Sequence, residues 1–180
     1  MDEMIDFLDE HGEKTGRVAS RTEVHNKGYW HRIAVVAVLD EQNRILLQQR
    51  SKDKVTNPGK WDISAAGHIE AGEDALTSAV RETAEEVGIE ATAKDFQYIM
   101  TYQKESHPIY QGTEIIDKQV YDFFVLKISA ETTQHIKLQE SEVQAAKFCN
   151  LDEFRQMLAS GVMVNRQPIY EAIMRLMEQS

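Results

Sequence analysis

The chain has 180 residues, a formal net charge of −10 at pH 7 and 42% hydrophobic residues. This length provides one domain with a substantial core, so we expect a single domain over residues 1–180. The negative charge argues against nonspecific binding to nucleic acid and to anionic membranes, because both are polyanions.

The N-terminal residues, MDEMIDFLDE, are acidic where a secretory signal is basic and then apolar. No apolar run reaches the roughly eighteen residues that a membrane span requires. The single cysteine, Cys149, cannot form an intramolecular disulfide, which fits a reducing compartment. We therefore expect a cytoplasmic protein without a membrane partner.

The first part of the chain predicts strands separated by one short helix. Residues 4–8 are typical of a strand, and the polar stretch 9–16 predicts a turn. Ser20 followed by Glu23 matches a capping box and predicts a helix over 21–26 that ends at Gly28. Residues 30–39 predict a buried strand that forms a hairpin with a second strand over 44–49.

A basic loop follows, RSKDKVTNPGKWDIS, before a strand predicted over 62–66. Four cations fall within eleven residues of this otherwise acidic protein: Arg50, Lys52, Lys54 and Lys60. The loop is consistent with an anion-binding wall and also with a solvated, mobile segment. Its position just before the acidic helix described next favours the anion-binding wall.

Residues 67–89, GHIEAGEDALTSAVRETAEEVGI, predict a glycine-rich turn that leads into an amphipathic helix. At about 100° per residue, four side chains form one stripe typical of a face packed on a core: Leu76, Val80, Thr83 and Val87. Glu82, Glu85 and Glu86 lie off this stripe at spacings of three and four residues, where like charges repel. A divalent cation such as Mg²⁺ would neutralise them; a solvated acidic face is the alternative.

The second half of the chain predicts strands over 96–104, 120–128 and 143–149, then helices over 151–159 and 168–178. Pro168 suits the first turn of the last helix. Strands on both sides of an acidic helix, followed by helices, predict an α/β fold in which a mixed β-sheet lies between α-helices.

The spacing around the acidic helix resembles the Nudix box, G-x5-E-x7-R-E-U-x-E-E-x-G-U with U apolar. The matching residues are Gly67, Glu73, Arg81, Glu82, Glu85, Glu86, Gly88 and Ile89. Only Thr83 departs from the pattern, and its methyl group can still pack while its hydroxyl bonds a carbonyl one turn back.

The resemblance implies the Nudix fold and a metal site. It implies that Mg²⁺, with Mn²⁺ as a substitute, is held by three glutamates and the backbone carbonyl of Gly67: Glu82, Glu85 and Glu86. It also implies that Arg81 pairs with Glu73 to hold the loop against the helix.

The flanking segments RTEVHNKGYWHRI, LLQQRSKDKVTNPGKWD and AAGHIEAGE resemble isopentenyl-diphosphate isomerase and related hydrolases. This resemblance implies that Arg50 and Lys54 bind the diphosphate of the substrate. The isomerase carries its catalytic cysteine where this chain has Ala66, which cannot transfer a proton. Loss of such a group costs a factor of about 10²–10⁴. The complete carboxylate set instead predicts hydrolysis on an isomerase-like framework.

Histidines in corresponding places of the isomerase bind a second metal, so the resemblance implies a second site at His25, His31 and His68. The spacing between His25 and His31 is one residue shorter than expected from the isomerase, and histidines with a purely structural role are the alternative. Outside the box, Glu142 is the candidate for an additional base or ligand, and Glu140 is the runner-up; a surface carboxylate is the alternative.

We therefore predict Mg²⁺-dependent hydrolysis of a phosphoanhydride in a nucleoside diphosphate linked to another moiety, or in a similar organic diphosphate. The candidate catalytic residues are Glu82, Glu85, Glu86 and Glu142. The expected partner is this small-molecule substrate, and both a monomer and a homodimer are compatible with the sequence. The alternatives are an isopentenyl-diphosphate isomerase and a noncatalytic Nudix-fold nucleotide sensor.

Overall fold

The computed structural model describes residues 2–54, 56–110 and 112–179. The strands are β1 (Met4–Leu8), β2 (Lys14–Ser20), β3 (Trp30–Leu39), β4 (Ile45–Arg50), β5 (Trp61–Asp62), β6 (Ala65–His68), β7 (Phe96–Ser106), β8 (Ile109–Tyr110), β9 (Thr113–Glu114), β10 (Asp117–Lys127) and β11 (Val143–Cys149). The helices are α1 (Arg21–Lys27), α2 (Ala75–Val87), α3 (Ala130–Thr133), α4 (Leu151–Ala159) and α5 (Gln167–Glu178), with a 3₁₀ turn, η1, at Ala93–Asp95.

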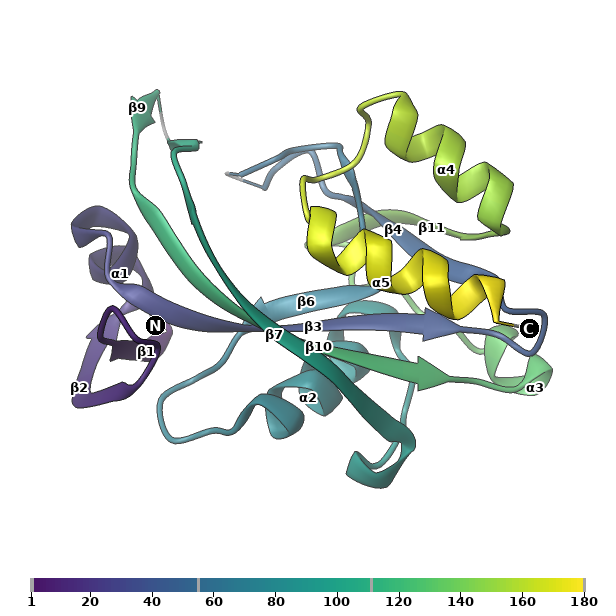
Figure 1. Ribbon diagram of the computed structural model, residues 1–180, viewed down its shortest axis with the longest axis horizontal. Coiled ribbons are helices and arrows are strands. Elements are labelled where there is room, and N and C mark those ends of the chain that lie inside the picture. The colour runs from purple at the N-terminus through teal and green to yellow at the C-terminus, as the bar shows by residue number, and fades with distance from the viewer. Residues whose placement is uncertain (1, 55, 111, 180) are drawn as a thin grey trace.

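Strand β3 is the centre of a mixed sheet (Figure 1). It pairs in parallel with β10 along its whole length, and antiparallel with β1, β4 and β6. Strand β7 extends the sheet beyond β10, while β2, β5 and β11 pair with β1 and β4. Nine strands join this sheet in the described part of the chain, and β8 and β9 form a separate pair.

Alternate residues of β3 face two different cores, because successive side chains of a strand point to opposite faces. Ala34, Val36 and Val38 pack in the core that also contains Ala79 and Val87 of α2. Ile33, Val35, Ala37 and Leu39 pack in the core covered by α4 and α5. The sheet is therefore enclosed between helices, as the sequence predicted.

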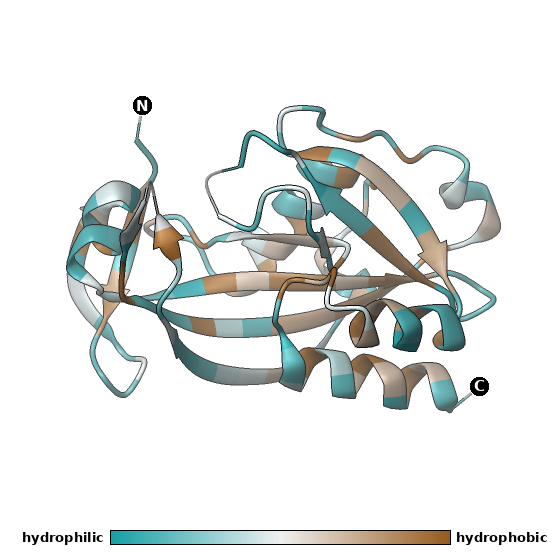
Figure 2. Ribbon diagram, turned by 90° about the horizontal axis from the view of Figure 1, so that it is seen from above, coloured by the Kyte–Doolittle hydropathy of each residue, from teal (hydrophilic) through white to brown (hydrophobic). Residues whose placement is uncertain are grey.

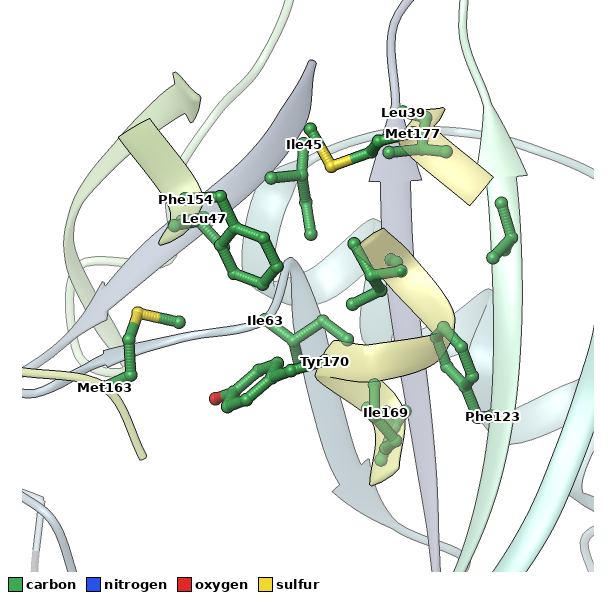
Figure 3. Close-up of a cluster of buried hydrophobic side chains, with 14 of the residues drawn as sticks. Leu39, Ile45, Leu47, Ile63, Phe123, Phe154, Met163, Ile169, Tyr170 and Met177 are labelled. Carbon is green, nitrogen blue, oxygen red and sulfur yellow. The ribbon is translucent and has the colours of Figure 1, made fainter. Parts of the chain in front are cut away.

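Figure 3 shows the core under α4 and α5, where Phe154, Ile169, Tyr170 and Met177 meet strand residues such as Leu47. In Figure 2 the loops around the sheet are mostly coloured as hydrophilic, and hydrophobic segments fall mainly on strands and helices. No helix in the described residues is long and apolar enough to cross a lipid bilayer.

Several elements differ from the sequence-based expectations. The turn over 9–16 was predicted too long, because β2 already begins at Lys14. This strand is almost entirely exposed and is held by backbone pairing with β1, so it lacks the apolar alternation that marks a half-buried strand. The strand predicted over 62–66 is divided into β5 and β6.

The predicted hairpin of β3 and β4 forms only at its closed end, where Leu39 pairs with Ile45. Farther along, β6 occupies the edge of β3 from Ile33 to Val36, so β4 must diverge and pairs with β5 and β11. Ser64 fills the fork, because its hydroxyl accepts from Val38 N at 2.8 Å and donates to Leu46 O at 2.5 Å. This fork opens the sheet next to the acidic helix.

Candidate functional site

Helix α2 carries the acidic face, and both of its ends are fixed by the sequence. Asp74 caps the first turn by accepting from Thr77 N at 2.8 Å. Gly88 ends the helix in the left-handed conformation, at φ 68°, where a Cβ would also lie only 2.8 Å from Lys137. Thr83 is fully buried, and its hydroxyl donates to Ala79 O at 2.7 Å, as expected from the sequence.

The glutamates of α2 do not share one environment. Glu82 and Glu86 are buried at 8% and 7% exposure and face β6, whereas the Glu85 side chain is half exposed. Glu86 Oε2 accepts from Gln48 Nε2 at 2.7 Å and from Ala66 N at 3.0 Å. Glu82 packs on Gly67 so closely that a Cβ there would lie 2.0 Å from its carboxyl carbon. Only glycine allows this approach.

Burial first, and then the charge of Glu86, raises the pKa of Glu82 to about 7. Burial likewise raises the pKa of Glu86, although Ala66 N and Gln48 act against the increase. Two buried carboxylates one helical turn apart are costly unless a positive charge compensates them. The oxygen-rich donor set of Glu82, Glu85 and Glu86 beside the Gly67 backbone suits a hard cation such as Mg²⁺.

Arg81 connects the loop before α2 to the acidic face. Its Nη2 donates to Glu73 at 3.0 Å and to His68 O at 3.2 Å, and its Nη1 donates to Glu82 at 2.7 Å. Glu73 also accepts from the Ser78 hydroxyl at 2.6 Å. These bonds give the Arg81–Glu73 pair the geometry of a structural clamp.

Two of the four cations of the basic loop line the same cavity as the carboxylates, namely Arg50 and Lys54. Arg50 donates to Thr56 O at 3.0 and 3.2 Å and lies 3.7 Å from Asp62. Lys54 contacts the carboxylate of Glu142. Lys52 and Lys60 are exposed and do not belong to the described cavity lining.

Three histidines from α1, β3 and β6 lie together beside the acidic helix: His25, His31 and His68. One ring nitrogen from each lies within 4.8 Å of the others. The Nδ1 atoms of His25 and His31 lie 2.8 and 3.0 Å from backbone carbonyls. A carbonyl only accepts, so these Nδ1 atoms carry the protons and the Nε2 lone pairs are available as ligands.

Asp117 and Glu3 complete this cluster, and sequence reasoning missed both. Asp117 Oδ1 lies 3.9 Å from His25 Nε2 and 3.7 Å from His31 Nε2, and Glu3 Oε2 lies 3.7 Å from His68 Nδ1. Within the described residues, both oxygens and the Nε2 atoms of His31 and His68 are buried without a hydrogen-bond partner. Such orphaned polar atoms fit a shared cation. Asp117 had no signal, because the strand was predicted to start at 120 instead of 117.

Burial lowers the pKa of His31 to about 4 and lowers the pKa of His68 well below its usual value. Burial also raises the pKa of Asp117 and of Glu3. Both histidines are therefore neutral at pH 7, the form in which imidazole binds a metal. Imidazole ligands favour transition metals over Mg²⁺.

The acidic helix, the basic loop and two members of the histidine cluster, His25 and His68, open on one cavity of about 880 Å³. Residues of β7, β10 and the segment before α5 close its far side. Ala66 lies in the wall, while Cys149 is buried with its Sγ 3.7 Å from Met157 Sδ in the core under α4. The described cavity lining therefore contains no thiol. Glu142 lies in the lining, and Glu140 is exposed outside it.

Comparison with protein families gives a match over residues 29–172 to the NUDIX domain. Nudix hydrolase 3 of Arabidopsis thaliana is 37% identical over 160 residues, covering 88% of this chain but 20% of that protein. This chain thus spans one fifth of that relative. An uncharacterized Nudix hydrolase of Clostridium acetobutylicum is 32% identical over 177 residues, covering 92% of this chain and 82% of that protein.

Two further comparisons concern the similarity to isopentenyl-diphosphate isomerases and the fold. An isopentenyl-diphosphate Delta-isomerase of Serratia proteamaculans is 38% identical over 103 residues, which cover 57% of this chain and 56% of the isomerase. The crystal structure of DR0079 from Deinococcus radiodurans superimposes with a TM-score of 0.71 at 16% identity, covering 96% of this chain and 98% of that chain. At that identity the likeness concerns the fold alone.

Proposed function

The chain belongs to the NUDIX domain family, and we propose that it is a divalent-metal-dependent hydrolase of an organic diphosphate. Its substrate would be a nucleoside diphosphate linked to another moiety or a similar compound. The observation that carries the proposal is that the buried carboxylates of Glu82 and Glu86 share one cavity with Arg50 and Lys54. A cation site facing two basic side chains suits a diphosphate.

In this proposal Glu82, Glu85 and Glu86 hold the metal with the carbonyl of Gly67. When bound, Mg²⁺ neutralises the diphosphate and lowers the pKa of a ligated water. Arg50 and Lys54 bind the phosphoryl oxygens and orient the anhydride for attack. Burial and the charge of Arg50 lower the pKa of Lys54, but an incoming phosphate favours its charged form.

The proton of the attacking water needs an acceptor among the cavity residues. Glu85 is the first candidate, because it is half exposed and its contact with Arg81 is long, at 3.5 Å. Glu142 is the second candidate. Its carboxylate contacts Lys54, so it becomes available once Lys54 turns towards a phosphate.

The histidine cluster supports a second metal site in the same cavity. We assign its ligands to His25, His31 and His68, completed by the carboxylate of Asp117. The neutral imidazoles and the orphaned Asp117 oxygen favour a transition metal such as Mn²⁺, Zn²⁺ or Co²⁺. This proposal disfavours isomerase chemistry, because Ala66 stands where the resemblance places the catalytic cysteine of the isomerase and has no proton to transfer.

The experiment that tests this function is a product assay on purified protein with Mg²⁺ or Mn²⁺. Nucleotide sugars, dinucleotides, coenzyme A derivatives and prenyl diphosphates are each incubated, and phosphate and monophosphate products are measured. We expect metal-dependent cleavage of a phosphoanhydride in at least one class. Interconversion of isopentenyl and dimethylallyl diphosphates without hydrolysis would instead support the isomerase.

A further inference from the structure

At the inner wall of the cavity, two arginines share one buried carboxylate. Asp62 is fully buried in β5 and accepts from Arg166 Nε at 2.7 Å and from Arg166 Nη2 at 2.9 Å. Arg50 Nη1 lies 3.7 Å from the same oxygen that accepts from Arg166 Nη2. Because the two guanidinium groups approach one oxygen, they lie close together in the wall.

Three cationic side chains, Arg50, Arg166 and Lys104, gather in this wall around the carboxylates of Asp62 and Asp117. Burial lowers the pKa of Arg50, and the charge of Arg166 acts in the same direction. Lys104 also lines the cavity here and donates to Asn165 O at 2.8 Å. The paired bonds from Arg166, opposing the effect of burial, hold the pKa of Asp62 below its usual value, so Asp62 stays charged.

Aromatic stacking is not what this wall offers. The ring of Tyr121 stacks on Tyr102 at 4.7 Å between centroids, and the Arg166 Cζ lies over it at 5.5 Å. A nucleobase would find the ring already covered. Arg166 lines the cavity with 9% of its side chain exposed, and its guanidinium is fixed by the two bonds to Asp62 and lies over the Tyr121 ring. Only two of its three nitrogens bond Asp62, so donor capacity remains.

We propose that Arg166 forms an anion subsite that recognises an oxyanion adjacent to the diphosphate held by Arg50 and Lys54. This inference rests on the proposed function and specifies its substrate class. The proximity of Arg50 and Arg166 matches neighbouring phosphoryl groups of one chain, so compounds with a third consecutive phosphate are preferred over those with a diphosphate alone. A planar guanidinium that is already ordered loses little entropy on binding phosphate.

The alternative is that Arg166 is purely structural and attaches the segment before α5 to β5. The backbone already makes that attachment. Trp61 N donates to Val162 O at 3.0 Å, and Val164 N donates to Trp61 O at 2.8 Å. The buried ion pair is therefore an addition to an existing anchor, and its position in the cavity wall gives it access to substrate.

The test is calorimetric binding of two inorganic probes, tripolyphosphate and pyrophosphate, in the presence of Mg²⁺, to the 180-residue chain. The Glu85→Gln background suppresses turnover in all proteins compared. We expect tripolyphosphate to bind roughly tenfold more tightly than pyrophosphate, since a hydrogen bond to a charged group is worth at least that factor. In Arg166→Gln most of this preference is lost. Arg175→Gln, an exposed arginine of α5, keeps it.

If Arg166→Gln does not fold, the same comparison is made with the double variant Asp62→Asn/Arg166→Gln. This variant removes both charges and so leaves no unpaired carboxylate at position 62. Equal affinity for both probes in the protein with Asp62 and Arg166 intact would overturn the subsite. A preference for tripolyphosphate that survives in the double variant would overturn it as well. An equal loss of affinity for both probes on substituting Arg166 also overturns it. Because the readout is binding, absence of hydrolysis would refute the proposed function without deciding the subsite.

Discussion

The carboxylate of Glu82 lies directly on the Cα of Gly67, where a Cβ would come within 2.0 Å of the carboxyl carbon. The contact joins the loop before α2 to the acidic face of that helix. Gly67 does not have a positive φ, so its importance is the missing side chain and not its backbone freedom.

Gly67→Ala should therefore displace Glu82 and lower kcat/KM by about 10²-fold, a typical result of moving a reacting group by about 1 Å. The decisive control is a thermal-unfolding cycle with Glu82→Ala. If the damage is a collision between the two side chains, Gly67→Ala lowers Tm in the parent protein but not in Glu82→Ala. An equal decrease in both backgrounds would contradict this.

The raised pKa of Glu82 predicts a pH-dependent stability. Folding raises this pKa from 4.5 to about 7, so the folded state binds the proton more tightly than the unfolded state. The resulting stability is present in full below pH 4.5 and is lost as the pH rises to about 7. We expect the metal-free protein to lose Tm over this range more steeply than Glu82→Gln, which cannot titrate. Parallel Tm profiles for the two proteins would contradict a raised pKa of Glu82 in the folded state.

The Nudix-box carboxylates were predicted from sequence because their relationship is local. Residues three and four apart on a helix are neighbours whatever the rest of the chain does. The same is true of the clamp between Arg81 and Glu73 across a short loop.

The resemblance also named Arg50, Lys54, Glu142 and the three histidines, but the contacts that these residues make, and the residues Asp117, Glu3 and Arg166, depend on pairing between distant segments and were not predicted. Asp117 reaches His31 because β10 runs parallel to β3, and Glu3 arrives with β1. Arg166 meets Asp62 across 104 positions, and Lys54 meets Glu142 across 88. Single arginines, lysines and carboxylates carry no spacing pattern that would join them.

The histidine cluster should bind a transition metal. We expect Zn²⁺ or Co²⁺ to raise Tm, because a ligand that binds only the folded state stabilises it. His31→Gln and Asp117→Asn should lose most of this increase, and His135→Gln, which changes an exposed histidine, should retain it. Metal content after dialysis, measured by mass spectrometry, checks the same point. Unchanged metal uptake by both His31→Gln and Asp117→Asn would contradict a second metal site at the histidine cluster.

Because Glu142 contacts Lys54, it has two possible roles: to position Lys54 or to accept the proton of the attacking water. Lys54→Ala should raise KM for the diphosphate substrate about tenfold through loss of a charge-assisted contact. Lys52→Ala, in the same loop but exposed, serves as the control and should leave KM unchanged.

For Glu142→Gln, a rise in KM with constant kcat indicates that Glu142 positions Lys54. A fall in kcat whose pH dependence is also altered indicates that it accepts the proton of water. Steady-state kinetics across pH 6–9, within the range of a base near neutrality, distinguish the two. A variant with unchanged KM and kcat would leave Glu142 with neither role.

The most direct test of the metal-dependent hydrolase is the activity of Glu86→Gln beside Glu90→Gln, an exposed glutamate just after α2. The measurement is the Mg²⁺-dependent initial rate of phosphate or monophosphate release from the best substrate of the panel. We predict that Glu86→Gln lowers this rate by about 10³-fold, since metal stabilisation of the transition state is worth several kcal/mol, and that Glu90→Gln does not change it. Undiminished hydrolysis by folded Glu86→Gln would contradict the account.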